Sequence, residues 1–248
     1  MEDSRPNTRE APPLEALPFF SLIVPAHNEE EYIAATLEHI QAQTYPIDRF
    51  EVLVIENGSS DQTYAISRRY ERNNVQVHTY SARGVSFARN CGLEHMSDRA
   101  DWVIFLDADT RVAPTFLSEV AQALKNTRRV ACGTTRVQPE SARMRDKVWF
   151  RVYDVIHATF HNSWCLFFVR ADVARAHRFN ERAVLMEDVQ YLRAAQQHGS
   201  FRFIDTATVY TSTRRMRKDG WLSLILLYTW VGVLPPWLQE RFGYDIVR

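Results

Sequence analysis

The sequence predicts an α/β fold in which a mostly parallel central sheet is flanked by helices. Short apolar runs rich in β-branched and aromatic residues recur along the chain, and each is followed by a helical pattern or a polar turn. This alternation is typical of βαβ units, which form parallel sheets covered on both faces. The chain has 248 residues and is 46% hydrophobic, which is enough for one sizeable core.

The chain divides into three parts by composition. Residues 1–17 are polar and proline-rich, lack the apolar stretch of a signal peptide, and predict a flexible tail. Residues 18–212 hold the alternating pattern and are expected to form one domain. Residues 213–248 form a basic and then apolar C-terminal segment.

Within the domain, the elements can be placed in order. Strands are expected at residues 19–25, 50–56, 75–80 and 102–107. After the first strand, Ile33, Leu37 and Ile40 fall on one helical stripe. A later helix is expected to begin near Pro114, because proline suits a first helical turn, and to end near Lys125.

Polar residues follow the predicted strands, with "PAHNEE" after the first, "ENGSSDQT" after the second and "DADT" after the fourth. Taken alone, "ENGSSD" is better explained as a capped loop, with Asp61 or Ser60 as the N-cap of the next helix. Because the carboxyl ends of parallel strands meet at one edge of a sheet, however, these loops should converge there on a ligand.

Asp107 and Asp109 are separated by one alanine at the end of a buried strand, where their charges repel. A divalent cation relieves this repulsion, and hard oxygen ligands suit Mg²⁺ or Mn²⁺, which keep positions open for phosphate oxygens. The pair therefore indicates a nucleotide diphosphate as the ligand. The alternative is that Asp109 caps the helix near Pro114 while Asp107 accepts from loop amides.

Five motifs, "SLIVPAHNEEEYI", "EVLVIENGSSDQT", "ARGVSFARNCGL", "WVIFLDADT" and "FNERAVLMEDVQYLRAAQQHG", occur in the order and approximate spacing of family 2 glycosyltransferases with the GT-A fold. The sequence resembles this family from about Phe19 to Arg215. The resemblance implies transfer of a sugar from a nucleotide-diphosphate donor to an acceptor hydroxyl, with inversion at the anomeric carbon. It also implies that Asp109, with Asp107, holds the metal and that Asp107 contacts the ribose or the sugar.

The resemblance further implies roles for other residues. Nucleotide or donor contacts are expected at Pro25, His27, Glu29, Asn57, Arg89, Asp107, Asp109, Arg214 and Arg215. Asp188 matches the catalytic base, and burial together with the neighbouring Glu187 would raise its pKa. Taken alone, this acidic pair is better explained as a helix start that suits the macrodipole.

The sequence departs from the family after the second strand, where Glu56 and Asn57 replace two adjacent aspartates. An asparagine can still bind a base edge, but the usual preference for uridine is weakened. UDP- or GDP-sugars are the favoured donors, a deoxythymidine donor stays open, and no third protein ligand for the metal is apparent.

A helix is expected over "VWFRVYDVIHATFH", with a packed stripe formed by Trp149, Val152, Tyr153, Ile156 and Phe160. This helix is expected to form the acceptor wall, where Trp149 or Trp164 could stack on a sugar or an apolar acceptor. His157 and His161 are spaced for zinc, although packing in the core is the better explanation.

The C-terminal segment combines "RRMRK" at residues 214–218 with an uncharged stretch at residues 220–238. Pro235 and Pro236 interrupt this stretch, so we expect a helix lying in a membrane interface, or alternatively an ordinary buried helix. By resemblance, Arg214 and Arg215 could instead close over the donor pyrophosphate. The acceptor is expected to be a glycan or a lipid-linked molecule.

Charge and cysteine content restrict the partners and the location. The 30 basic and 30 acidic residues balance, which argues against nucleic acid as a partner. Three unpaired cysteines suit a reducing compartment, so the expected location is the cytoplasm, with the inner face of the membrane as the alternative within it. Two other classes stay open: a non-catalytic nucleotide-sugar-binding or scaffolding protein, and a nicotinamide-dependent oxidoreductase, although no GxGxxG follows the first strand.

Overall fold

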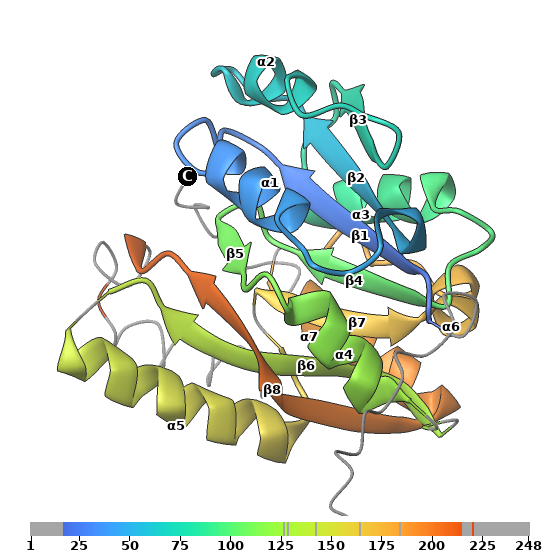
Figure 1. The fold of residues 1–248 in the computed structure, drawn as a ribbon, viewed down its shortest axis with the longest axis vertical. Coiled ribbons are helices and arrows are strands. Elements are labelled where there is room, and N and C mark those ends of the chain that lie inside the picture. The colour runs from blue at the N-terminus through green and yellow to red at the C-terminus, as the bar shows by residue number, and fades with distance from the viewer. Residues whose placement is uncertain are drawn as a thin grey trace, which may run out of the picture.

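The computed structural model describes residues 17–125, 127, 129–141, 143–163, 165–183, 185–214 and 220. Within these residues the chain forms an eight-stranded sheet in the order β3-β2-β1-β4-β7-β6-β8-β5 (Figure 1). The strands are β1 Phe20–Ala26, β2 Phe50–Asn57, β3 Val75–Tyr80, β4 Trp102–Leu106, β5 Thr110–Val112, β6 Val130–Pro139, β7 Leu166–Arg170 and β8 Ser200–Thr211.

The first half of the sheet is parallel and the second half is mixed. β1 pairs in parallel with β2 and β4, and β2 pairs in parallel with β3. β7 is antiparallel to β4 and β6, whereas β6 and β8 are parallel. The short β5 is antiparallel to β8. The α/β class is confirmed, and β1 to β4 lie where strands were predicted.

Helices cover both faces of the sheet (Figure 1). They are α1 Ile33–Gln41, α2 Thr63–Arg68, α3 Val85–His95, α4 Phe116–Leu124, α5 Met144–Phe160, α6 Ala171–Ala176 and α7 Glu187–Ala195, with short 3-10 turns at Ile47–Arg49 and Gln196–His198. Side chains of α1, α4 and α5 join one apolar cluster with the sheet, and those of α3, α6 and α7 join a second. This gives three layers with two cores.

Two predicted features of the helices are confirmed and one is corrected. Ile33, Leu37 and Ile40 are at most 1% exposed, so the predicted stripe faces the core. The helix predicted near Pro114 begins at Phe116, because Pro114 lies in a turn in which the Phe116 N–H donates to the Ala113 carbonyl. The end of that helix, Leu124, agrees with the prediction.

The stripe predicted for α5 is wrong in part, because Trp149, Tyr153 and Ile156 are half-buried but its other two residues are exposed. Val152 and Phe160 are 43% and 72% exposed, whereas the buried residues of α5 are Asp146, Phe150 and His157. Apolar residues occur on all sides of this helix, so their spacing alone did not identify the inward side.

The remaining predictions on packing concern histidine, cysteine and the membrane. Burial lowers the pKa of His157 to about 4, and His161 ends α5 in a left-handed conformation. Among the described residues, no cluster of three metal-ligating side chains occurs. All three cysteines are described, buried and unpaired. In the described part of the chain, no helix has the length and apolarity needed to cross a bilayer.

Candidate active site

The loops after β1 and β2 are joined by side-chain hydrogen bonds at the carboxyl edge of the sheet. His27 Nδ1 donates to the Asn57 carbonyl at 2.8 Å, which fixes the hydrogen on that nitrogen because a carbonyl only accepts. The Asn28 N–H donates to Ser59 Oγ at 3.1 Å. The Glu29 N–H donates to Thr63 Oγ1 at 2.7 Å. The predicted convergence of these two loops is therefore present.

The loop after β2 is held by Glu56. One of its carboxylate oxygens accepts from the Ser59 N–H at 2.6 Å, and the other accepts from Thr79 Oγ1 at 2.6 Å. Gly58 has φ of 74°, and a Cβ there would lie 2.9 Å from the Ser81 carbonyl oxygen. Both the conformation and the space favour glycine. Glu56 thus shapes the loop through its own hydrogen bonds.

Asn57 is 1% exposed and presents one free acceptor. Its Nδ2 donates to the Gly84 carbonyl at 3.2 Å, at the start of α3. Within the described residues, its Oδ1 is buried without a hydrogen-bond partner. Because buried oxygens are nearly always bonded, this atom marks a place where a ligand could donate.

The acidic pair lies on the turn between β4 and β5. The Asp107 N–H donates to the Cys165 carbonyl, and the Thr110 N–H donates to the Asp107 carbonyl, each at 3.0 Å. Thr36 Oγ1 of α1 donates to the Ala108 carbonyl at 2.7 Å. The turn is therefore fixed through its backbone, which leaves the two carboxylates for other partners.

Arg89 joins Asp107 to the start of α7. Its Nη1 lies 3.0 Å from Glu187 Oε1, and its Nη2 lies 3.3 Å from Asp107 Oδ1. The guanidinium carbon lies 5.4 Å from the ring centroids of both Phe167 and Phe179. Arg89 is 3% exposed. The sequence suggested a donor contact for this arginine, whereas in the structure it connects the predicted metal site with the predicted base site.

Asp188 is half-buried in the first turn of α7. Burial raises the pKa of its carboxyl, the adjacent Glu187 raises it further, and Arg89 opposes both effects. Met186, the residue directly before α7, has φ of 62°, a left-handed conformation that is uncommon for methionine. A carboxylate with a raised pKa in a fixed position is suited to accept a proton.

Arg214 follows β8 and binds two carboxylates from the other side of the site. Its Nη2 lies 2.7 and 2.8 Å from the two oxygens of Glu29, and 3.3 Å from Asp109 Oδ2. Its guanidinium also lies over the ring of Tyr32. Burial raises the pKa of Asp109 to about 6, with Glu29 adding to the effect and Arg214 opposing it. Asp109 thus pairs with a cation rather than capping α4.

For the other predicted site residues, the structure gives no hydrogen bond or ion pair to this cluster among the residues it describes. Pro25 is buried within β1, and Trp149 is half-buried on α5. Trp164 and Arg215 lie outside the described residues. Sequence reasoning did not find Thr36 or Gly84, because each contributes through a single bond that has no sequence signal.

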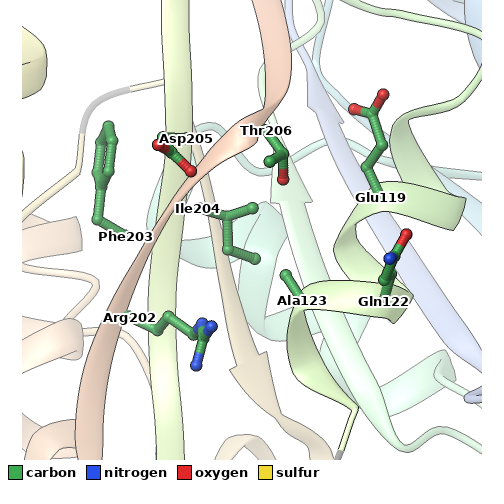
Figure 2. Close-up of a pocket in the computed structure, with 8 residues that line it drawn as sticks. All are labelled: Glu119, Gln122, Ala123, Arg202, Phe203, Ile204, Asp205 and Thr206. Atoms are coloured by element: carbon green, nitrogen blue, oxygen red, sulfur yellow. The ribbon is translucent and has the colours of Figure 1, made fainter.

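A separate hollow of about 270 Å³ lies between α4 and β8 (Figure 2). Glu119, Gln122 and Ala123 line it from α4, and residues 202–206 line it from β8. The register of β8 against β6 shifts after Ile204, within the part of β8 that lines the hollow. None of the predicted site residues that the structure describes lines this hollow.

The residues present fit a divalent cation through their chemistry. Asp107 and Asp109 offer only carboxylate oxygens, the ligands that Mg²⁺ and Mn²⁺ prefer. Asp109 already lies 3.3 Å from a cationic group, the Arg214 guanidinium. The described residues supply no third carboxylate or imidazole ligand, so diphosphate oxygens and water would have to complete the shell.

Comparison with solved structures identifies the class of fold, which is that of GT-A glycosyltransferases. The structure of Staphylococcus aureus TarS 1–349 in complex with UDP matches with a TM-score of 0.65 at 20% identity, over 89% of this chain and 68% of that chain. The mannosyltransferase PcManGT from Pyrobaculum calidifontis, in complex with GDP-Man and Mn²⁺, matches with a TM-score of 0.63 at 22% identity. That match covers 81% of this chain and 58% of the other.

The family follows from the sequence itself. The model of the family described as glycosyl transferase family 2 matches residues 21–182, more than half of the chain, and the protein belongs to this family. It is 40% identical over 96 residues to glycosyltransferase AglE of Haloferax volcanii, and this match covers 38% of this chain and 31% of AglE. It is 35% identical over 107 residues to the poly(ribitol-phosphate) β-N-acetylglucosaminyltransferase TarS of S. aureus, and this match covers 41% of this chain and 18% of TarS. The matched part thus spans a third or less of these relatives.

Proposed function

We propose that the protein transfers a sugar from a nucleotide-diphosphate donor to an acceptor hydroxyl with inversion, using Asp188 as the base. The observation that carries this proposal is the pair of contacts made by Arg89, which joins Asp107 to Glu187 beside Asp188. A scaffold that only binds nucleotides needs no carboxylate with a raised pKa at that place. The family match also favours a glycosyltransferase over a nicotinamide-dependent oxidoreductase.

Asp107 and Asp109 would hold Mg²⁺ or Mn²⁺, and a bound cation would stabilise the charge that develops on the diphosphate leaving group. Arg214 is placed to exchange its contact with Asp109 for a diphosphate oxygen while it stays bound to Glu29. Arg215 would assist from the adjacent position. A neighbouring fold, PcManGT, is described in complex with Mn²⁺, which supports a metal in this class.

Asp188 would accept the proton of the acceptor hydroxyl as that oxygen attacks the anomeric carbon. Glu187 and burial keep its pKa high, so the carboxylate holds the proton well once it is transferred. Arg89 holds Glu187 in place through an ion pair, and this pair compensates the negative charge of Glu187 beside the base. A single displacement with one base on the side opposite the leaving group gives inversion.

Asn57 would read the base, with His27 and Pro25 supporting the same loop. Because Gly84 accepts from Nδ2, the free Oδ1 is an acceptor and can bind a base N–H much as an aspartate would. We therefore propose a UDP- or GDP-sugar as donor. TarS structures are described with UDP and UDP-GlcNAc, and PcManGT with GDP-Man.

For the acceptor we propose a glycan or a lipid-linked molecule, with Trp149 and Trp164 as stacking residues. A relative from Methanococcus voltae, 29% identical over 103 residues, is named as a transferase acting on a dolichyl phosphate sugar. The same proposal divides the chain into a tail at residues 1–17, a domain at 18–212 and a basic and apolar C-terminal segment at 213–248 that would contact a membrane interface. A cytoplasmic location is consistent with the three buried free cysteines.

A thermal-shift screen of UDP-, GDP-, TDP- and CMP-sugars, with and without Mn²⁺, tests this function. At about 100 times its Kd, a ligand stabilises by about 2.7 kcal/mol, which raises Tm by roughly 5–10 °C for a domain of this size. We expect such a shift for a UDP- or GDP-sugar, and only with Mn²⁺. A shift with none of the four, or with NAD(H) alone, would contradict the proposal. A shift without transfer to any acceptor would support the non-catalytic binding protein, which the Glu56 and Asn57 substitutions favour.

A further inference from the structure

One row of apolar side chains on α5 faces solvent. Met144, Val148, Val152 and Val155 are 74%, 55%, 43% and 65% exposed. Their spacing of four, four and three residues places them in a single row along the helix. We call these four residues the α5 ridge. The opposite side of α5 packs on β6 and β8, so the ridge lies on the outside of the molecule.

The surroundings of the ridge are positively charged. Arg143, Arg145, Lys147 and Arg151 are all exposed, and helical periodicity puts Arg145 on one side of the ridge and Lys147 and Arg151 on the other. Of the two acidic residues of α5, the buried Asp146 lies 3.3 Å from the Arg145 guanidinium and offsets that cation. Asp154 accepts from the Val137 N–H and pairs with Arg136. The basic residues at and beside the ridge therefore stay in excess.

The ridge begins close to the candidate active site. The Glu140 N–H donates to the carbonyl of Thr211 at the end of β8, and the Glu140 carboxylate lies 3.0 Å from Arg111 of β5. β5 starts directly after Asp109. In Figure 1, α5 runs along β6 and β8 from this end of the sheet. The segment that leads into the ridge is therefore connected through β5 and β8 to the turn that carries the acidic pair.

We propose that the α5 ridge docks on an anionic lipid bilayer. An exposed apolar row flanked by cations suits the interface, where the apolar side chains enter the headgroup region and the cations bind anionic lipid. A second copy would present the same cations and so would bring like charges together. The chain's own residues 220–238 carry no charge, and they are the alternative occupant that the experiment below distinguishes. In combination with the proposed function, this docking would present the site to a lipid-linked acceptor.

The test measures binding of the full chain to phosphatidylcholine vesicles with and without about 30% phosphatidylserine. The variants are Val148→Glu with Val155→Glu, and Lys147→Ala with Arg151→Ala, which leaves the ion pair between Arg145 and the buried Asp146 in place. Ile47→Glu is the matched control, because Ile47 is 62% exposed and lies away from α5. We expect the wild type and the control to bind anionic vesicles. The affinity of the glutamate variant for anionic vesicles should fall at least about tenfold, and each cation removed should lower this affinity about fivefold.

Several results would overturn the proposal. They are absence of wild-type binding, equal binding to neutral vesicles, and unchanged binding by both variants. A lower Tm of the glutamate variant without vesicles would show that the ridge is covered by the chain itself, and a change from oligomer to monomer would show that a second copy covers it. Both findings would also overturn it. The nucleotide-dependent Tm shift is measured separately and should be the same in all variants, so failure of this inference is distinct from failure of the proposed function.

Discussion

The guanidinium of Arg89 compensates carboxylates from two distant parts of the chain. Asp107 and Glu187 are 18 and 98 residues away from it in sequence, yet both lie within 3.3 Å of its nitrogens. A buried arginine without such partners would be strongly destabilising. Its position between Phe167 and Phe179 leaves it little freedom to move. Arg89 therefore acts as a positioning residue for both sides of the site.

The effect of Glu187 on Asp188 predicts a shift in pH dependence. Replacing Glu187 with glutamine removes the adjacent negative charge and so lowers the pKa of Asp188. Since a base acts when deprotonated, the rise of kcat/KM with pH should move to lower pH. Burial is unchanged, so the midpoint should still lie above the value of about 3.9 for an ordinary aspartate.

The measurement is a pH profile of sugar transfer under kcat/KM conditions. Glu94→Gln, at an exposed position of α3, is the control and should leave the profile in place. A rise that stays where it is in Glu187→Gln, or that moves to higher pH, would show that Asp188 is not the group that titrates.

At the scale of the elements, the close packing of α3 on β1 positions Arg89. Gly92 lies one turn after Arg89, and a Cβ there would lie 2.4 Å from Ile23 Cγ2. Glycine thus allows the helix to approach the central strand more closely than any other residue would. The Arg89 ion pairs depend on this distance because they reach from α3 across to β4 and α7.

We therefore predict that Gly92→Ala affects both stability and activity. Overpacking of this kind costs about 1–3 kcal/mol, which lowers Tm by roughly 2–4 °C per kcal/mol. Transfer should fall as well, because α3 moves away from Asp107 and Glu187. Thermal unfolding and transfer rates at a temperature where the variant is folded measure the two effects. The control Glu94→Ala, on the outer side of α3, should change neither the Tm nor the transfer rate. If Gly92→Ala transferred sugar at the wild-type rate, the position of Arg89 would not matter for catalysis.

At the scale of the whole molecule, the sequence predicted the parts of the fold that have a local signal. β1, β2 and β4 are mostly apolar runs whose residues are all buried, and a polar loop follows each of them. β5 has only three residues, and β8 mixes exposed and buried residues along its length. Neither has the period or the run that identifies a strand, so both were missed. β6 and β7 were not predicted either, although β7 is a short buried apolar run.

The same distinction applies to the candidate site. The acidic pairs at residues 107–109 and 187–188 are local motifs and were found directly. The contacts between Arg89 and Glu187 and between Arg214 and Glu29 span 98 and 185 residues. They result from the order of the strands in the sheet, which no single segment encodes. The direction in which α5 faces was also mispredicted, because it depends on packing against β6 and β8.

The central claim is that Asp188 takes the proton from the acceptor while a separate acidic pair serves the donor. Sugar transfer by Asp188→Asn, measured beside its Mn²⁺-dependent nucleotide Tm shift, tests this claim most directly. Asparagine keeps the size of the side chain but cannot accept the proton, and general base catalysis contributes about 10²–10⁴-fold. We predict a loss of transfer in this range with the nucleotide shift retained. Transfer at the wild-type rate by a variant that still binds nucleotide would contradict the account.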